Sequence, residues 1–174
     1  MIRSVNNKAP KIAESAFVSE AAYIVGDVEI GENAIVWPGA VLRGDFGKIK
    51  IGQNTAVEEG CVIHSGSLSG VGDVLIGENV IIGHGAVLNC RKVGNNTLIG
   101  MNSTILHDVE IGNFCIIAAA CLVSQGMKIT DRSFVAGVPG KIKGEASAQQ
   151  LSWTEFNPEY CSSIARQYKA EPGL

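Results

Sequence analysis

Three histidines and the polar residues near them are the side chains of this sequence that could carry out chemistry. His64, His84 and His107 each follow an aliphatic residue by one or two positions, and Glu58 and Asn89 occupy corresponding places. Imidazole is both a metal ligand and a general base near neutral pH, and a neighbouring carboxylate supports either role. The sequence therefore predicts a metal site or an acid–base site, provided that the fold brings these residues together.

The elements that position them follow from a six-residue period. Aliphatic residues occupy the repeated positions Ile12, Val18, Ile24, Ile30, Val36, Leu42, then Ile51, Val57, Ile63, then Ile76, Ile82, Leu88, then Val93, Ile99, Ile105, Ile111, Ile117, Val123, Ile129 and Val135. This period fits neither an ordinary strand nor a helix, and it is typical of a parallel β-helix. We therefore predict an all-β fold, a hexapeptide-repeat β-helix over residues 10–140, in which three hexads form one triangular coil.

The residue before each aliphatic points outward, so these residues describe three faces. One face is charged, with Lys11, Glu29, Lys50, Leu75, Lys92, Glu110 and Lys128. The second carries Tyr23, Val41, Val62, Val87, Thr104 and Leu122. The third carries Phe17, Ile35, Ala56, Ile81, Leu98, Ile116 and Phe134. Because a monomer rarely exposes so much contiguous apolar surface, the second and third faces both need cover.

Part of that cover is expected from the chain itself. The hexads stop after residue 140, and a C-terminal helical segment over residues 145–170 is predicted to pack on the β-helix. Its apolar residues at roughly helical spacing are Leu151, Phe156, Tyr160, Ile164 and Tyr168. Asn157 and Pro158 predict a break between two short helices. The other apolar face is expected to contact neighbouring subunits, which favours a cyclic homotrimer.

Counting along the coils places the candidate site residues on two edges. His64 and Asn89 follow aliphatics that are three hexads apart, so they stack on one edge, with Arg43 one coil below. His84 and Glu58 stack on the preceding edge. The two edges diverge within a subunit but could meet across a trimer interface.

His107 lies one coil above Cys90 and therefore beside Asn89. It is a candidate catalytic residue or an additional ligand, and a solvated corner residue is the alternative.

Composition excludes several classes of function. A net charge of −3 over 174 residues, without a basic cluster, argues against nucleic acid as a partner. No stretch approaches the roughly 20 apolar residues of a membrane span, and the N-terminus has no signal-peptide pattern. We expect a cytoplasmic protein that acts on a small-molecule substrate. Cys61, Cys115 and Cys121 occupy small inward positions, so no disulfide framework is expected.

Four segments carry specific motifs: residues 41–45 (Val-Leu-Arg-Gly-Asp), 59–64 (Glu-Gly-Cys-Val-Ile-His), 82–88 (Ile-Gly-His-Gly-Ala-Val-Leu) and 93–101 (Val-Gly-Asn-Asn-Thr-Leu-Ile-Gly-Met). These segments resemble the gamma-class carbonic anhydrase family. The likeness extends over roughly residues 10–169. It implies a left-handed β-helix trimer with a metal ion, usually zinc, held between subunits by three histidines. His64 matches the first ligand, and His84 matches the one donated by the neighbouring subunit.

This chain departs from the family pattern at the third ligand and around it. Asn89 stands where the family has histidine, and Ala56 and Glu58 stand where it has the asparagine and glutamine that orient the metal-bound water. The loop over residues 65–74 contains Asp73 as its only acid, so the proton-shuttle glutamate of longer members has no counterpart.

The resemblance thus implies a divalent metal, zinc or ferrous iron, held by His64, His84 and Asn89. In this hypothesis Glu58 supplies the missing charge, Glu58 or a water chain exports the proton, and His107 assists. Arg43 and Asp45 are interpreted as an interface ion pair. A protein without metal is the alternative.

Two other functions stay open. Residues 137–141 (Gly-Val-Pro-Gly-Lys) resemble a segment near the C-terminal coils of hexapeptide acyltransferases. An acyl-CoA-dependent acyltransferase or thioesterase would use one histidine, His84 or His107, as a general base without any metal. A trimeric binding protein without catalysis is the third hypothesis.

Overall fold

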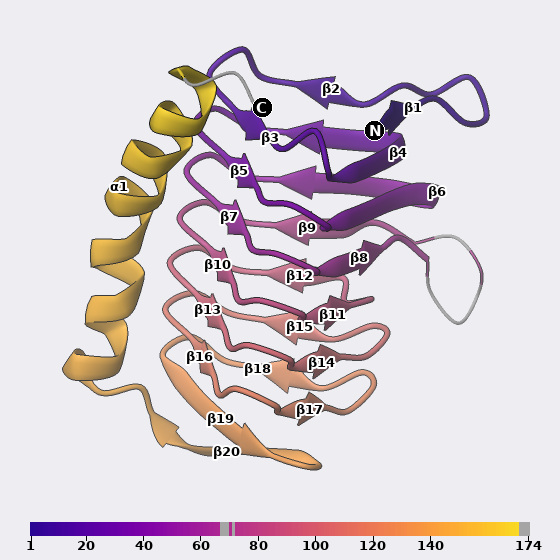
Figure 1. Ribbon diagram of the computed structural model, residues 1–174. Coiled ribbons are helices and arrows are strands. Elements are labelled where there is room, and N and C mark those ends of the chain that lie inside the picture. Colours follow the sequence, from indigo (N-terminus) through magenta and orange to yellow (C-terminus); the bar gives the residue numbers. More distant parts are fainter. Residues whose placement is uncertain (67–69, 71, 171–174) are drawn as a thin grey trace.

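The computed structural model describes residues 1–66, 70 and 72–170, apart from the side chains of residues 155–162 and 169. Figure 1 shows a stack of triangular coils with one long helix standing along its side. Seven parallel strands, in the order β19-β16-β13-β10-β7-β5-β3, line one face of the described chain, and β20 joins them antiparallel at the end. The predicted all-β solenoid with a C-terminal helix is confirmed.

Strands are short because each side of the triangle holds one hexad. The third face holds β3 (Phe17–Val18), β5 (Ile35–Val36), β7 (Ala56–Val57), β10 (Ile81–Ile82), β13 (Leu98–Ile99), β16 (Ile116–Ile117), β19 (Ser133–Gly137) and β20 (Gly140–Glu145). The other two faces form one sheet with β1 (Ile2–Arg3), β2 (Lys11–Ile12), β4 (Tyr23–Ile30), β6 (Val41–Ile51), β8 (Val62–His64), β9 (Val74–Ile76), β11 (Val87–Leu88), β12 (Lys92–Val93), β14 (Thr104–Ile105), β15 (Glu110–Ile111), β17 (Leu122–Val123) and β18 (Lys128–Ile129). The long strands β4 and β6 run around the corner between these faces, which is why the two faces count as one sheet.

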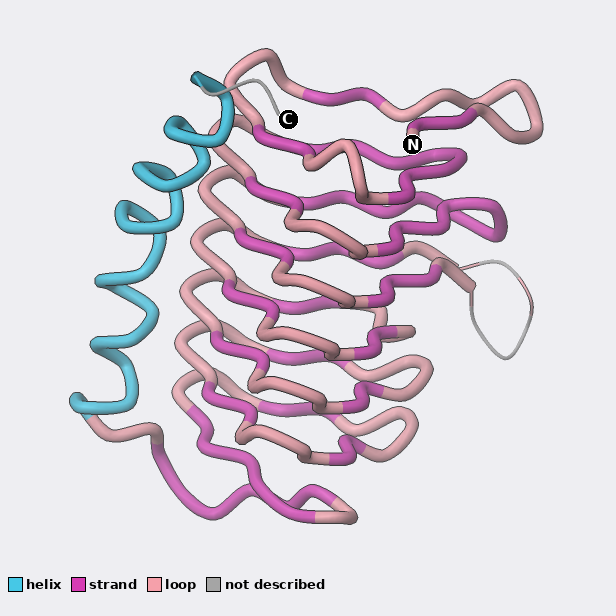
Figure 2. The backbone as a smooth tube through the Cα atoms, in the orientation of Figure 1, coloured by secondary structure: helices cyan, strands magenta, loops and turns pink. Residues whose placement is uncertain are grey.

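The register of the coils agrees with the six-residue period. On the third face, Ile81 pairs with Ala56 below and Leu98 above. On the second face, Val87 pairs with Val62 and Thr104. Figure 2 shows how the strands of successive coils lie in parallel rows separated by turns. The stacking that places the site residues was therefore predicted correctly.

The interior is filled by the repeated aliphatics and by small residues between them. Leu42, Ile63 and Leu88, which precede the site residues on one edge, are all 0% exposed. Cys61, Cys115 and Cys121 are buried and free, as the sequence predicts, and so is Cys90. Burial raises the pKa of Cys61 to about 11. The side chain of Cys161 lies outside the described residues.

Close stacking of the coils requires glycine next to one of the candidate residues. A Cβ atom on Gly83 would lie 2.9 Å from the backbone nitrogen of Met101 and 3.0 Å from the carbonyl oxygen of Ile99. Side chains do not tolerate such contacts with backbone atoms. Gly83 therefore lets the coil above approach at the point where His84 leaves the strand.

The helix α1 (Ala148–Ala170) covers the third face. At one end Ala165 and Ile164 pack against Phe17, Ile35 and Trp37. At the other end Leu151 packs with Ile116, and Leu98 and Phe134 lie against this second cluster. This apolar face thus has its cover within the chain.

The start of α1 is capped by side chains. The backbone N–H of Ser147 donates to Gln150 Oε1 at 2.8 Å, and that of Gln150 donates to Ser147 Oγ at 3.2 Å. This reciprocal arrangement satisfies two backbone donors of the first turn.

The predicted break at Asn157 and Pro158 is wrong, because one helix of 23 residues runs through both positions. A proline in a helix interior removes one backbone hydrogen bond and costs about 3 kcal/mol. Packing at both ends of the helix against the third face outweighs that cost. The side chains of Phe156 and Tyr160, which were expected to contribute, lie outside the described residues.

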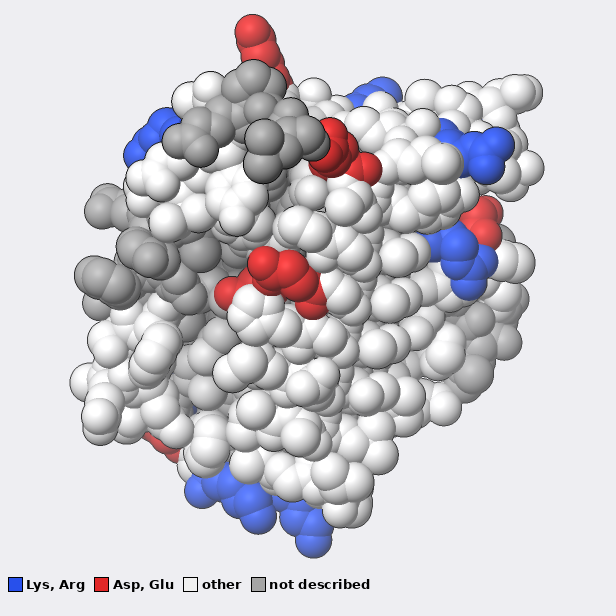
Figure 3. Space-filling view, viewed as in Figure 1, with Lys and Arg blue, Asp and Glu red and all other residues white. Residues whose placement is uncertain are grey.

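The second face has no cover in the described part of the chain. Its outward residues Tyr23, Val41, Val62 and Leu122 are half-buried, and Val87 is 37% exposed. Figure 3 shows the molecule in the orientation of Figure 1. On the side turned toward the viewer, Lys and Arg lie mainly near the margins. No helix within the described residues combines the length and apolar character that a bilayer span requires.

Candidate functional site at two corners of the coil

The first candidate group lies at the corner after β7 and β10. Glu58 follows β7 and His84 follows β10 by two residues, so the parallel pairing of the two strands stacks them. One oxygen of the Glu58 carboxylate accepts the backbone N–H of His84 at 3.0 Å and lies 3.2 Å from the ring Nε2. Ring Nδ1 lies 2.7 Å from a carboxylate oxygen of Glu59. His84 therefore sits between two carboxylates.

The two carboxylates differ in their environment. The Glu58 side chain is 15% exposed, whereas that of Glu59 is 50% exposed. Burial raises the pKa of Glu58, and the charge of His84 partly opposes that rise. Glu58 is thus a half-buried, positionally fixed partner of His84, and Glu59 is an exposed partner that solvent or a ligand can replace.

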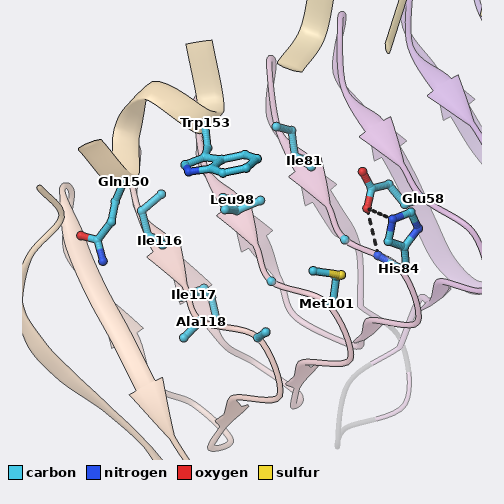
Figure 4. A pocket seen from close by; sticks show the side chains of 13 residues that line it. Glu58, Ile81, His84, Leu98, Met101, Ile116, Ile117, Ala118, Gln150 and Trp153 are labelled. Atoms are coloured by element: carbon cyan, nitrogen blue, oxygen red, sulfur yellow. Dashed lines mark hydrogen bonds and ion pairs between the residues drawn. The ribbon is translucent and has the colours of Figure 1, made fainter. Parts of the chain in front are cut away.

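A cavity of about 430 Å³ opens beside this pair. Ile81, Leu98 and Ile116 of three successive coils line one wall, and Trp153 of α1 lies over them. Figure 4 shows Glu58 and His84 at one end of this apolar trough, with Gln150 toward the other end. Such a space suits the apolar part of a small molecule whose polar group lies at His84.

The second candidate group lies at the next corner, after β8 and β11. Arg43 and His64 are register partners on adjacent coils, and Asn89 follows β11 on the coil above. The Arg43 guanidinium donates to Asp45 Oδ2 at 2.6 Å, and His64 Nε2 lies 3.2 Å from Asp45 Oδ1. The Asn89 amide nitrogen lies 3.3 Å from His64 Nδ1 and donates to the His64 carbonyl oxygen at 3.2 Å.

This corner is a chain of hydrogen bonds from Arg43 through Asp45 and His64 to Asn89. Burial and the nearby Arg43 charge lower the pKa of His64, so its neutral form is favoured. Burial alone would raise the pKa of Asp45, but the hydrogen bond and charge of Arg43 outweigh it and the net shift is downward. The ring of Phe46 meets the His64 ring edge-on, with centroids 5.8 Å apart.

His107 lies near this second corner but outside its hydrogen-bond chain. Its charge also lowers the pKa of His64, which indicates proximity. Its carbonyl oxygen accepts the backbone N–H of Gly126 at 2.9 Å in the turn of the next coil. Its predicted role as a catalytic residue or ligand stays a prediction.

Two other expected features also have a place in the structure. Asp73, from the loop over residues 65–74, accepts the backbone N–H of Lys48 at 2.8 Å, whereas residues 67–69 and 71 lie outside the described part. Residues 137–141 span the end of β19, a turn at Val138 and Pro139, and the start of the antiparallel β20.

The two groups sit at successive corners of the coil, as the sequence indicates. Within the described residues no three His, Cys, Asp or Glu side chains of one chain are placed to hold a metal ion. Position 89 carries an amide, and both ring nitrogens of His64 already have hydrogen-bond partners. These side chains do not fit a zinc centre built from three imidazoles. Within one chain, the contacts that these side chains make are those of hydrogen bonding and proton transfer.

Comparison with known proteins identifies the family. The family described as bacterial transferase hexapeptide (six repeats) matches residues 9–44 and 92–125. The carnitine operon protein CaiE of Escherichia coli (strain K12) is 34% identical over 158 residues, which cover 90% of this chain and 79% of that relative. The chain belongs to the hexapeptide-repeat family.

This hexapeptide-repeat protein is also similar to carbonic anhydrases of the gamma class. Mitochondrial gamma carbonic anhydrase 1 of Arabidopsis thaliana is 33% identical over 173 residues, which are 98% of this chain and 63% of the relative. The chain therefore spans less than two thirds of that relative's length. The resemblance stated from the sequence is confirmed at the level of the family.

Solved structures give the same fold. The X-ray structure of a putative acetyltransferase from Bacillus cereus has a TM-score of 0.91 and 34% identity, and the match covers 97% of this chain and 96% of that one. A hexapeptide transferase family protein from Anaplasma phagocytophilum has a TM-score of 0.89 and 31% identity, with 96% and 97% covered. A gamma carbonic anhydrase and a putative acetyltransferase are thus both among the similar proteins.

Sequence analysis of this hexapeptide-repeat protein missed three contributors to the candidate site. Glu59 contacts His84 from an outward turn position, where the period makes no demand on residue type. Trp153 and Gln150 line the cavity from the helix. A tryptophan that lies off the apolar spacing of the helical segment, two residues after Leu151, is a sequence signal that could have indicated it.

Proposed function

We propose that this chain is a hexapeptide-repeat enzyme that processes acyl thioesters, either by hydrolysis or by transfer of the acyl group. The observation that carries the proposal is the pairing of His84 with the half-buried Glu58 at the end of an apolar cavity of about 430 Å³. A histidine oriented by a carboxylate is a general base, and the cavity is suited to an acyl group. Carbon dioxide alone has no need of a cavity of that size.

Proton transfer can be assigned to individual ring atoms. A carboxylate accepts only, so the hydrogen on His84 Nδ1 points to Glu59 at 2.7 Å, and Nε2 lies 3.2 Å from Glu58. In this proposal His84 loses the Nδ1 proton to solvent once Glu59 is displaced and keeps its proton on the Nε2 side, so Nδ1 is the basic nitrogen during the reaction. Nδ1 faces the exposed Glu59, so a bound substrate or water can take the place of that carboxylate. Because Glu58 also accepts the His84 backbone N–H, the ring orientation is maintained when Glu59 is displaced.

The reaction then needs no group beyond these side chains, water or an acceptor, and substrate. Nδ1 removes the proton of the attacking hydroxyl, and its oxygen forms a bond to the thioester carbonyl carbon. The tetrahedral intermediate collapses with cleavage of the carbon–sulfur bond, and the thiolate takes the proton from the imidazolium. Glu58 stabilises the imidazolium between these two steps.

Relatives and the uncovered second face support an assembled site. The Bacillus cereus structure at 34% identity is described as a putative acetyltransferase. Hexapeptide-repeat proteins are commonly trimers. In a homotrimer whose second faces point to the axis, the His84 corner of one subunit meets the His64 corner of the next. The cavity beside His84 would then adjoin Asn89 and His64 of a neighbouring subunit.

Reversible hydration of carbon dioxide is the second candidate, and the similarity to the Arabidopsis carbonic anhydrase over 98% of the chain favours it. When bound, a zinc ion supplies an activated water in such enzymes. In this chain His64, the neighbour's His84 and Glu58 would have to hold the ion, because Asn89 replaces the third imidazole. Metal content separates this candidate from the first.

Release of free thiol from acyl-CoA esters tests the first candidate. The full chain, purified without an affinity tag, is assayed against acetyl-, hexanoyl- and decanoyl-CoA, with and without hydroxyl and amine acceptors. Turnover that is lost in His84→Ala and preserved after chelation supports the proposal. Turnover of carbon dioxide alone contradicts it, and tight binding of acyl-CoA without turnover favours the non-catalytic hypothesis.

A further inference from the structure

The His64 ring has no nitrogen left for a ligand. Nε2 lies 3.2 Å from Asp45 Oδ1, and Nδ1 lies 3.3 Å from the Asn89 amide nitrogen. The His64 carbonyl oxygen accepts a hydrogen bond, which requires the amide nitrogen of Asn89 on that side and sets the orientation of the amide. Both N–H groups of this amide nitrogen are therefore directed at His64.

These contacts are consistent with one protonation state. A carboxylate accepts only, so the hydrogen on Nε2 points to Asp45, and Nδ1 accepts from Asn89. The Arg43 guanidinium, 2.6 Å from the other Asp45 oxygen, keeps that carboxylate ionised and in place. His64 is thus a neutral imidazole whose single lone pair points at Asn89.

The contact between His64 Nε2 and the Asp45 carboxylate is typical of a histidine that binds a metal through its other ring nitrogen. Such histidines usually donate their second ring N–H to a carboxylate, which orients the ring and makes the other nitrogen a better ligand. Asp45 occupies that place on His64 Nε2. Nδ1 is accordingly the nitrogen that would face a metal, and the Asn89 amide lies on it.

We propose that Asn89 acts as an internal substitute for a metal ion: it occupies the ligand direction of His64 and keeps this corner free of metal. A corollary is that the corner retains a latent divalent-metal site. Replacing the amide with a ligating side chain removes the hydrogen bond to Nδ1 and adds the missing donor, and His84 of a second subunit completes the set. This inference does not depend on the substrate of the His84–Glu58 pair.

Zinc content measured by mass spectrometry tests it, on the full-length oligomer after dialysis against zinc and gel filtration. Wild type is expected to retain only trace zinc. Asn89→His and the near-isosteric Asn89→Asp are expected to retain about one zinc per subunit interface. Adding His84→Ala to either variant is expected to abolish that retention, and Asn89→Ala serves as the control that frees Nδ1 without adding a ligand.

A second readout uses cobalt instead of zinc. Co²⁺ in a tetrahedral or five-coordinate protein site gives visible absorption bands, which are expected in Asn89→His and Asn89→Asp and not in wild type. Stoichiometric zinc in wild type that is lost on His64→Ala overturns the proposal and favours carbon dioxide hydration. Folded Asn89→His and Asn89→Asp proteins that both stay metal-free overturn it as well. If Asn89→His does not fold, Asn89→Asp decides.

Discussion

Glu58 holds His84 at two points, because one carboxylate oxygen both accepts its backbone N–H at 3.0 Å and lies 3.2 Å from its ring Nε2. Two coils are thereby joined at the end of the apolar cavity. The backbone contact fixes where the carboxylate sits, and the ring contact orients the imidazole with Nε2 toward Glu58. Glu59 contacts the same ring from solvent and has no such backbone contact among the described interactions.

Replacing each carboxylate by its amide should separate these two roles. Glu58→Gln retains an oxygen for the backbone N–H but cannot stabilise an imidazolium, so kcat on acyl-CoA is expected to fall about 100-fold. Glu59→Gln, the matched control, is expected to change kcat by no more than about threefold, because exposed ion pairs contribute little. Steady-state thiol release measures both. Equal losses in the two variants would contradict the assignment of Glu58.

The raised pKa of Glu58 also predicts how stability responds to that substitution. Burial disfavours the ionised carboxylate, so its folded pKa lies above its unfolded pKa. Ionised Glu58 therefore lowers stability above the folded pKa, and the penalty disappears as pH falls through it. Glu58→Gln is expected to leave the melting temperature at pH 7 unchanged or higher. A lower melting temperature there, with no such decrease in Glu59→Gln, would contradict this expectation.

Trp153 is expected to determine the length of acyl chain that the protein accepts. It lies over the cavity wall, although it is 64% exposed to solvent. Trp153→Ala should raise KM for decanoyl-CoA about tenfold, equivalent to about 1.4 kcal/mol of lost apolar contact, and leave KM for acetyl-CoA nearly unchanged. Gln149→Ala, at an exposed position one turn away, is the control. An equal change for both substrates would show that the chain does not occupy this cavity.

Asp45 should stabilise the fold in a pH-dependent way. Its folded pKa is lowered, because the hydrogen bond and charge of Arg43 outweigh burial, so its stabilising effect is present above the unfolded pKa and is lost as pH falls through the folded pKa. Asp45→Asn is expected to lower the free energy of unfolding at pH 7 by about 1 kcal/mol, with solvent screening included. Urea unfolding from pH 7 to pH 3 should show the difference from wild type shrinking.

The comparison variant for Asp45 is Asp27→Asn. Asp27 pairs with Lys8, whose side chain is 58% exposed. Asp27→Asn is expected to lower the free energy of unfolding at pH 7 by less than Asp45→Asn does, because an exposed ion pair contributes less to stability. A difference between Asp45→Asn and wild type that does not change between pH 7 and pH 3 would mean that Asp45 acts through packing alone.

Two leucines allow a direct test of the repeat. Leu88 is 0% exposed and precedes Asn89, whereas Leu75 is 43% exposed on the charged face. Leu88→Ala is expected to lower the free energy of unfolding by about 2–5 kcal/mol through loss of burial and cavity formation. Leu75→Ala is expected to change it by less than about 0.5 kcal/mol. Denaturant titration monitored by circular dichroism measures both values.

The pairing of coils could be predicted from the sequence because the period leaves one consistent stacking. Every sixth residue must be aliphatic to fill the interior, so residues three hexads apart pair, as His64 does with Arg43. The repeated aliphatics still pair after unequal steps, as Ile51 does with Ile76, and the nine-residue step after Leu42 is absorbed by a register shift between β4 and β6. The edges that carry His64 and His84 were predictable for the same reason.

The helix shows where local signals were insufficient. Asn157 and Pro158 indicate a break, yet α1 continues through them because its two ends pack on one straight face of the coil. The cavity next to Trp153 depends on the distance between that helix and the coil. No sequence period encodes that distance.

The sequence by itself determined the repeat, the three faces and the two edges on which the candidate residues stand, since these follow from which side chains must be buried. Only the tertiary structure decided how those residues are used. It directs the Asn89 amide at His64 Nδ1, places Glu58 against His84 at two points and leaves a space beneath Trp153. These features depend on side-chain rotamers and on helix docking, where contacts between distant residues outweigh local pattern.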